Sequence, residues 1–335
     1  MSHSFLLVRL GSLGDVIHAI PTAAALRARF PDARIDWMVD PQYVSLLEMV
    51  RGLDSRIAVN TRRFGATLST LGDLRRVGYT AALDLQGLLK SAVLARAVGA
   101  ERTIGFTAGH LRERTAGPFY THRVDPAHSH VIFKNLALLE PLGSRDVRVS
   151  FPLEIPDSAA TEQVRATFHG EPYAVINPGA AWPNKRWPPD RFGALAATLR
   201  DRFGLRSVVL WGPSEKPLAQ QVSAASDGAA DPAPATSISD LFAIARPARI
   251  LISGDTGPLH IAAAVGTPLV ALFGPTRAER NGPWSTADCV VARTGTCSCL
   301  YKRRCRRSAA CINDIQLPEV VDAVERRLST TNGTI

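Results

Sequence analysis

Two short turns of small residues each place an aspartate directly after an apolar run. They are Gly11-Ser12-Leu13-Gly14-Asp15 in the first half of the chain and Ser253-Gly254-Asp255-Thr256-Gly257 in the second. If the apolar runs are strands, each aspartate lies at a carboxyl end, where open α/β sheets bind their ligands. Asp15 could then act as a general base, although an aspartate at such a position also commonly caps the following helix. The residues alone leave both interpretations open.

The segment after the second turn has the features of an anion-binding helix start. Pro258 and Gly266 bracket a predicted helix over 258–265, with proline at its first position and glycine after its last. The free N–H groups and positive end of such a helix attract phosphate, and His260 could add a donor. Structural βαβ units show the same pattern, and the turn lacks the G-x-G-x-x-G spacing typical of dinucleotide binding. A nicotinamide oxidoreductase is therefore disfavoured.

Lys185 is the third candidate for chemistry. It lies in Asn177-PGAAWPNKRWPP, between prolines and tryptophans, where we expect a loop. Lysines are usually solvated, but one held beside a helix-end anion site could neutralise a departing diphosphate. Trp187 and the prolines after it could equally serve only the entry into the next helix.

The elements that must position these residues follow the pattern of βα units around a parallel sheet, because short apolar runs alternate with longer amphipathic stretches. We expect strands at 5–10, 34–39, 81–85, 173–176, 207–211, 250–252 and 269–273. We expect helices at 23–29, 88–98, 189–202, 258–265 and 318–328. The Ala/Pro-rich segment 228–236 is expected to be an exposed loop.

The segment 150–158 contains two prolines and no helical period, and it is the expected linker. It divides the chain into domains 1–155 and 156–335. The last segment, 318–335, has a helical pattern that could pack on either domain, including back on the N-terminal one.

Composition limits the partners of the protein. The chain has 335 residues, 46% of them hydrophobic, and a formal net charge of +9. Only five of its 39 basic residues are lysines, which reflects either codon bias or a surface for acidic substrates or an anionic membrane. No nucleic-acid-binding signature accompanies the charge, so nucleic acid is not an expected partner. With no signal peptide and no apolar run long enough to cross a bilayer, the protein is expected to be cytoplasmic.

Five stretches together resemble a known family. GSLGDVIHAIP, DLQGLLKSA, NPGAAWPNKRWP, LWGPSE and SGDTGPLHIAAAVGTPLVALFGPT occur in this order, as in the ADP-heptose:lipopolysaccharide heptosyltransferases. The similarity extends to about Thr286, and it is greatest with the first heptosyltransferase of inner-core assembly, because Asp84-LQGLLKSA is followed by Leu111-RERTAGPFY. The resemblance implies an α/β protein of the GT-B fold, with two Rossmann-like domains facing each other across a cleft. It implies acceptor binding in the N-terminal domain and nucleotide-sugar binding in the C-terminal one.

The resemblance also implies roles for individual residues. Asp15 would be the general base, and Lys185 would meet the phosphates together with the backbone around Thr256 and Gly257. Asp255 would hold heptose hydroxyls, and Glu215 in LWGPSE would hold the adenosine ribose. The acceptor contacts would be Lys90, Arg112, Arg62 and Arg63.

The implied reaction is transfer of heptose from ADP-heptose, with inversion, to the acidic Kdo sugar of a Kdo–lipid A acceptor. No cofactor is expected. The enzyme would touch the anionic inner face of the inner membrane only transiently. Another sugar donor, a protein acceptor and a non-catalytic nucleotide-sugar- or glycan-binding module remain alternatives.

The chain departs from the resembled branch in a cysteine-rich segment near its end. Cys297, Cys299, Cys305 and Cys311 are spaced C-x-C-x5-C-x5-C, which is not a standard zinc spacing. Five basic residues lie among them, and these would repel a cation while favouring thiolates. A bound metal, a disulfide and reduced thiols remain open, and we expect no metal to be required.

Overall fold

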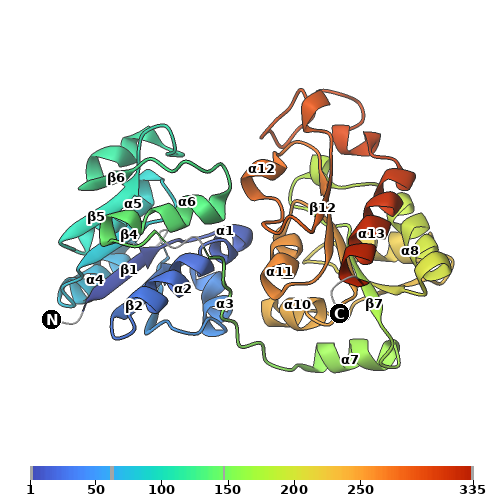
Figure 1. The fold of residues 1–335 in the computed structure, drawn as a ribbon, viewed down its shortest axis with the longest axis horizontal. Helices are drawn as coiled ribbons and strands as arrows, with labels where there is room; N and C mark the ends of the chain where they lie inside the picture. The colour runs from blue at the N-terminus through green and yellow to red at the C-terminus, as the bar shows by residue number, and fades with distance from the viewer. Residues whose placement is uncertain (1–2, 61–63, 146–147, 333–335) are drawn as a thin grey trace. The chain divides into compact units, whose positions relative to one another are not determined.

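The computed structural model describes residues 3–60, 64–145 and 148–332. The chain divides into two compact units, Met1–Glu154 and Ile155–Ile335, and Figure 1 labels many of the elements of each. The division falls inside the segment 150–158. Each unit contains one six-stranded sheet whose neighbouring strands are all parallel.

The N-terminal unit has the sheet order β3-β2-β1-β4-β5-β6. Its strands are β1 (Ser4–Val8), β2 (Arg34–Val39), β3 (Ser55–Ala58), β4 (Ala81–Asp84), β5 (Arg102–Phe106) and β6 (His122–Val124). Its α-helices are α1 (Leu13–Ile17), α2 (Ile20–Arg29), α3 (Val44–Glu48), α4 (Phe64–Arg75), α5 (Leu89–Ala97) and α6 (Val131–Ala137), and a 3₁₀ helix, η2, spans Arg114–Phe119. The strand order reverses between β1 and β4, and ligands of such sheets bind at this reversal.

The C-terminal unit repeats this topology, with the order β12-β11-β10-β7-β8-β9. Its strands are β7 (Tyr173–Asn177), β8 (Arg206–Val209), β9 (Ala230–Pro232), β10 (Ile250–Gly254), β11 (Leu269–Phe273) and β12 (Cys289–Ala292). Its α-helices are α7 (Ala159–Thr167), α8 (Pro189–Phe203), α9 (Lys216–Ala224), α10 (Ile238–Ala245), α11 (Gly257–Val265), α12 (Ala278–Asn281) and α13 (Leu317–Asn332). Counted from the first strand of each unit, both sheets follow the Rossmann order 3-2-1-4-5-6.

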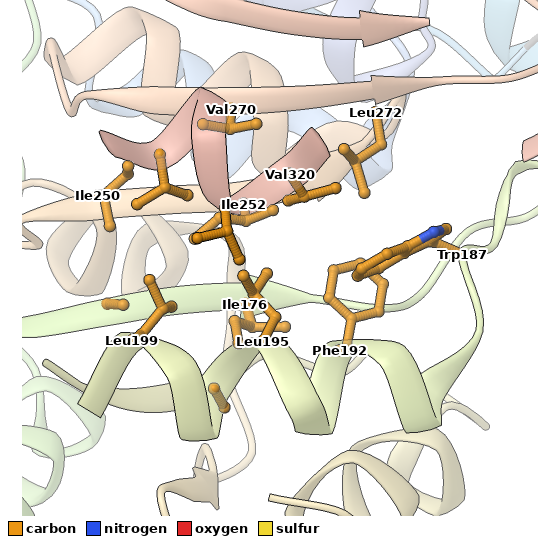
Figure 2. Close-up of a cluster of buried hydrophobic side chains, with 14 of the residues drawn as sticks. Ile176, Trp187, Phe192, Leu195, Leu199, Ile250, Ile252, Val270, Leu272 and Val320 are labelled. Atoms are coloured by element: carbon orange, nitrogen blue, oxygen red, sulfur yellow. The ribbon is translucent and has the colours of Figure 1, made fainter. Parts of the chain in front are cut away.

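A buried cluster holds α8 and α13 against the second sheet (Figure 2). Phe192 from α8 and Ile176 from β7 are among its fully buried members. Trp187 is also buried there, its ring centroid is 4.9 Å from that of Phe192, and its Nε1 donates to the carbonyl of Ile315 at 3.0 Å. These contacts favour one of the two interpretations that the sequence left open, in which Trp187 packs in the core and stabilises the start of α8.

Two expectations for the C-terminal unit can now be checked. The segment 228–236 is not simply an exposed loop, because β9 pairs with β8 as an edge strand and Ala230 is buried. The Ala/Pro composition hid this strand, since alanine and proline are poor strand formers. Helix α13 packs on β11, β12 and α8 of its own unit. No helix within the described ranges is long and apolar enough to span a bilayer.

Candidate active site

Asp15 is the third residue of α1, and both interpretations of it fit the geometry. Its carboxylate accepts hydrogen bonds from Ser12 N at 3.2 Å, which is the Asp15 half of a capping box, and from Ser12 Oγ at 3.1 Å. The same carboxylate is still 13% exposed, so capping does not close it to solvent. A carboxylate with its position fixed and one face open meets the first requirement of a general base.

Arg9 forms an ion pair with Asp15, and the sequence did not identify it as part of the site. Its side chain is only 4% exposed, and Nη2 lies 2.5 Å from Asp15 Oδ1. Nη1 donates to the carbonyl of Leu85, directly after β4, so the guanidinium joins the ends of β1 and β4. Trp37 Nε1 donates to the Arg9 carbonyl at 3.2 Å. A basic residue at the end of a buried strand, just before the small-residue turn, is the signal that could have identified it.

Arg112 lies beside Asp15 on its exposed side. Its Nη1 is 3.8 Å from Asp15 Oδ2, its side chain is 47% exposed, and its backbone N–H donates to Gly87 O at 3.1 Å. The next residue, Glu113, accepts from Leu89 N at 2.7 Å, so this segment is fastened to the start of α5. The exposed Lys90 is the second residue of that helix. Arg62 and Arg63, the other expected acceptor contacts, lie outside the described residues.

Asp84 in the DLQG stretch fixes the framework that carries Lys90 and Arg112. It is fully buried and accepts hydrogen bonds from Tyr120 Oη at 2.7 Å, Ser91 Oγ at 2.9 Å and Gln86 N at 2.8 Å. Burial raises the pKa of Asp84 above its ordinary value, against these hydrogen bonds. Gly105 is required beside it, because a Cβ there would lie 2.5 Å from the Tyr120 ring. The motif therefore positions α5 and η2.

Asp255 is the centre of the donor-side candidates in the C-terminal unit. Its Oδ2 accepts from Lys185 Nζ at 2.5 Å and Thr276 Oγ1 at 2.7 Å, while Oδ1 accepts from Asn281 Nδ2 at 2.5 Å. His260 Nε2 lies 3.6 Å from Oδ1. Burial alone would raise the pKa of Asp255, but the nearby His260 and the charge of Lys185 hold that pKa well below its usual range. Thr276 and Asn281 were not identified from the sequence.

Because Asp255 is so fully engaged, its clearest structural task is to position Lys185. Lys185 ends a short 3₁₀ helix, η4 (Pro183–Lys185), rather than lying in an irregular loop. Its Nζ is 4.7 Å from the Trp182 ring centroid, and its side chain is 14% exposed. Arg303 approaches the same ring, with Cζ 5.8 Å from the centroid. Trp182 thus contacts two cations.

Helix α11 begins one residue earlier than the sequence predicted. Its first residue is Gly257, so Pro258 occupies the second position, and its last residue, Val265, is followed by Gly266 with φ of +78°. Thr256 precedes the helix without capping it, because its Oγ1 instead accepts from Asn177 Nδ2 at 2.9 Å. The Thr256 side chain therefore does not cap the first-turn N–H groups of α11. A phosphate site requires that these groups are not capped by a side chain.

Glu215 joins two separate motifs of the C-terminal unit. Its Oε2 accepts from Gly212 N at 3.2 Å, and its Oε1 accepts from Arg186 Nη2 at 3.4 Å. The carboxylate lies so close to Gly179 that a Cβ there would be 2.1 Å from Oε2. This close contact explains why position 179, in Asn177-Pro178-Gly179, is a glycine: a side chain there would collide with the Glu215 carboxylate.

The four cysteines of the C-terminal segment are free thiols. Cys299 and Cys311 are buried, and the Sγ atoms of Cys297 and Cys299 are 3.5 Å apart. Across ranges 3–60, 64–145 and 148–332, no group of three or more His, Cys, Asp or Glu side chains is arranged to hold a metal ion.

Comparison with known proteins identifies a family that matches most of this chain. Residues 68–310 match the family described as glycosyltransferase family 9 (heptosyltransferase). The chain is 30% identical to lipopolysaccharide heptosyltransferase 1 of Pseudomonas aeruginosa over 317 residues, covering 90% of this chain and 86% of that protein.

Solved structures share the fold over nearly the whole chain. The family 9 glycosyltransferase of Veillonella parvula superposes with a TM-score of 0.80 at 24% identity, covering 98% of this chain and 97% of the other. The Escherichia coli heptosyltransferase WaaC with ADP-2-deoxy-2-fluoro heptose superposes with a TM-score of 0.70 at 22% identity, covering 90% and 96%. Two Rossmann-like units are the components of the GT-B class, as the sequence predicted. The chain therefore belongs to glycosyltransferase family 9, the heptosyltransferases, and is an enzyme that transfers glycosyl groups rather than a non-catalytic binding module.

Proposed function

We propose that this enzyme transfers heptose from ADP-heptose to the Kdo sugar of the lipopolysaccharide inner core, with inversion at the anomeric carbon. The observation that carries this proposal is the arrangement around Asp15, whose carboxylate is held by Arg9 and flanked by the exposed Arg112. This combines a positioned base with a cation for an acidic acceptor. The family membership and the ADP-sugar held by the related WaaC support the choice of donor.

On the acceptor side, Asp15 takes the proton of the attacking hydroxyl as its oxygen bonds to the anomeric carbon. Base catalysis of this kind contributes about 10²–10⁴-fold to the rate. Arg112 and Lys90 are exposed on one connected framework, and each could meet a carboxylate or phosphate of the acceptor. The N-terminal unit, approximately 1–155, would be the acceptor-binding domain.

On the donor side, the departing ADP carries the negative charge that the C-terminal unit must stabilise. Lys185 and the backbone N–H groups of Thr256 and Gly257 at the start of α11 supply positive potential for the diphosphate, with His260 beside them. Asp255 keeps the Lys185 ammonium in place and could still meet sugar hydroxyls, and Glu215 would meet the ribose. With lysine and backbone in this role, the reaction would not require a metal ion.

The lipid-linked acceptor implies where the enzyme works. We place it in the cytoplasm, peripheral at the inner face of the inner membrane. The net charge of +9 favours a transient approach to an anionic lipid surface, where each basic residue near the headgroups contributes about 1 kcal/mol.

A panel of nucleotide sugars, each incubated with enzyme and Kdo–lipid A, tests the proposal through the nucleotide released and the mass of the product. ADP release should occur with ADP-heptose and depend on the acceptor, and NMR of the product should show the inverted anomer. Release with another donor only, or transfer to a protein but not to Kdo–lipid A, would replace the proposed substrates.

A further inference from the structure

Lys185 and Arg186, the basic residues at the end of η4, already face carboxylates. Lys185 Nζ lies 2.5 Å from Asp255 Oδ2, and Arg186 Nη2 lies 3.4 Å from a Glu215 carboxylate oxygen. Each pair therefore adds little net charge to the donor side. The diphosphate of a nucleotide sugar carries a negative charge on each phosphate, and a further charge develops on the nucleoside diphosphate as it departs. The start of α11 supplies only about half of a positive charge, so a diphosphate bound here needs a further cation.

Arg303 lies where it can be that cation. Its Cζ is 5.8 Å from the centroid of the Trp182 ring, and Lys185 Nζ is 4.7 Å from the same centroid. An aromatic ring attracts a cation at such distances, so both positive groups are held beside one side chain. Within the ranges that the structure describes, Arg303 forms no ion pair with a carboxylate, and it is exposed. Its positive charge is therefore uncompensated and accessible to a ligand.

Two hydrogen bonds fix the chain directly before Arg303. Tyr301 N donates to Pro275 O at 2.7 Å. Asn184 Nδ2, from η4, donates to Lys302 O at 2.8 Å. Pro275 follows the end of β11 by two residues, at the carboxyl edge of the sheet, where α/β proteins bind their ligands. The segment that carries Arg303 is thus attached both to this edge and to η4.

We propose that Arg303 binds the diphosphate of the donor together with Lys185 and stabilises the nucleoside diphosphate as it leaves. The inference rests on the proposed transfer from a nucleotide sugar and adds a residue to its donor side. As the acceptor oxygen bonds to the anomeric carbon and its proton passes to Asp15, the bond from that carbon to the diphosphate breaks. The electron pair of the broken bond stays on the phosphate oxygen. A guanidinium suits this group, because it can donate two parallel N–H bonds to phosphate oxygens.

Calorimetric titration of the full-length enzyme with ADP, GDP, UDP and adenosine tests this role. In Arg303→Gln, the dissociation constant of the nucleoside diphosphate that the wild type binds most tightly should rise about ten- to a hundredfold. The affinity for adenosine, which has no phosphate, should stay the same and show that the variant is folded. Arg303→Lys should recover part of the loss, since it keeps the charge but not the paired N–H groups.

The matched control is Arg304→Gln, which removes the same charge from the next residue, also exposed. If only the general charge of the segment matters, both variants lose affinity equally. If Arg303 contacts the diphosphate, Arg304→Gln should change the dissociation constant by at most about fivefold. Steady-state kinetics of Arg303→Gln should show a higher KM for the donor and an unchanged KM for the acceptor.

The outcomes separate this inference from the proposed function. If Arg303→Gln binds ADP as tightly as Arg304→Gln does while ADP-heptose is still the donor, the inference is wrong and the proposed function stands. If GDP or UDP binds most tightly and its binding depends on Arg303, the proposed donor is wrong and the inference stands. An equal loss of adenosine affinity in Arg303→Gln would also overturn the inference. Failure of the wild type to bind any of these nucleoside diphosphates would overturn both.

Discussion

The Arg9 guanidinium and the Asp15 carboxylate are 2.5 Å apart at the end of one buried strand. Arg9 also donates to the carbonyl of Leu85, so a single side chain ties together the ends of β1 and β4, where the sheet order reverses. The Asp15 carboxylate is thus held in two ways: by the hydrogen bonds at the start of its own helix and by the positively charged Arg9 side chain.

Replacing Arg9 should change the chemistry of Asp15 and not only the stability of the unit. In Arg9→Ala, kcat should fall more than either KM changes, and the acid limb of the pH–rate profile should move to higher pH. The reason is that an adjacent cation favours an ionised carboxylate. Arg9→Lys should restore the pH profile in part. Lysine keeps the positive charge, but its single ammonium group cannot bind both Asp15 and the Leu85 carbonyl as the guanidinium does. Trp37→Phe is the control, because it removes a hydrogen bond to the Arg9 backbone and leaves the guanidinium. If the pH–rate profile of Arg9→Ala matches that of the wild type, Arg9 has only a structural role.

Asp15→Asn should nearly abolish turnover while ADP binding persists. The amide keeps the shape of the side chain but cannot accept the hydroxyl proton, so the rate should drop by about 10²–10⁴-fold. Single-turnover kinetics and calorimetric titration with ADP measure the two properties separately. Asp32→Asn, at an exposed site of the same unit, serves as the control. Turnover close to wild type in Asp15→Asn would contradict the assignment of the base.

Arg112→Ala should raise the KM for the acceptor and leave the KM for ADP-heptose nearly unchanged. Loss of a charged hydrogen bond to a carboxylate costs about 1.5–3 kcal/mol, or about ten- to a hundredfold. The alternative is that Arg112 acts only as a surface ion pair, which would limit the effect to about 1 kcal/mol. Steady-state kinetics with each substrate varied in turn distinguish the two, with Arg114→Ala as an exposed control on the same segment. A selective loss of donor affinity would mean that the acceptor site lies elsewhere.

Asp255→Asn should destabilise the C-terminal unit in a pH-dependent way. Breaking one side of the buried pair with Lys185 costs about 3–5 kcal/mol. The pKa of Asp255 is lower in the folded protein than in the unfolded chain, so its contribution is present above the unfolded value of about 3.9 and is lost as the pH falls below it. Calorimetric melting of both proteins from neutral to acid pH should therefore show their Tm values converge at low pH. A constant difference across this range would argue against an ionised Asp255.

Protein purified without added metal should contain substoichiometric zinc and iron, and chelators should leave its activity unchanged. The thiols of Cys299 and Cys311 favour their protonated forms, because burial raises their pKa values to about 11 and about 12. Elemental analysis checks the content. A full equivalent of metal that disappears in Cys305→Ser together with activity would contradict this expectation.

The parts of the site that could be predicted from the sequence are those formed by neighbours along the chain. Asp15 and Asp255 follow apolar strands within small-residue turns, and that pattern is local. The contact of Arg9 with Leu85, and those of Asp255 with Thr276 and Asn281, join residues 21 or more positions apart. Only the packing of neighbouring βα units brings such groups together, and no spacing rule reveals them.

The fold was predictable for a similar reason. Strands buried on both faces are continuous apolar runs, as in β11, where all five residues are buried. The three-residue edge strand β9 has no such run, and its pairing depends on β8. The start of α11 was displaced by one residue because glycine at position 257 can begin a helix as well as precede it.

Trp182 has a practical consequence, because its indole ring lies near two positive charges, Lys185 and Arg303. Indole emission responds to charges close to the ring. A diphosphate that neutralises Lys185 would change the local field at this one tryptophan, while Trp187 in the core would stay insulated from it. The enzyme thus carries an intrinsic fluorophore beside Lys185, the residue that we propose meets the diphosphate, so that nucleotide binding at the proposed site could be followed optically without a label.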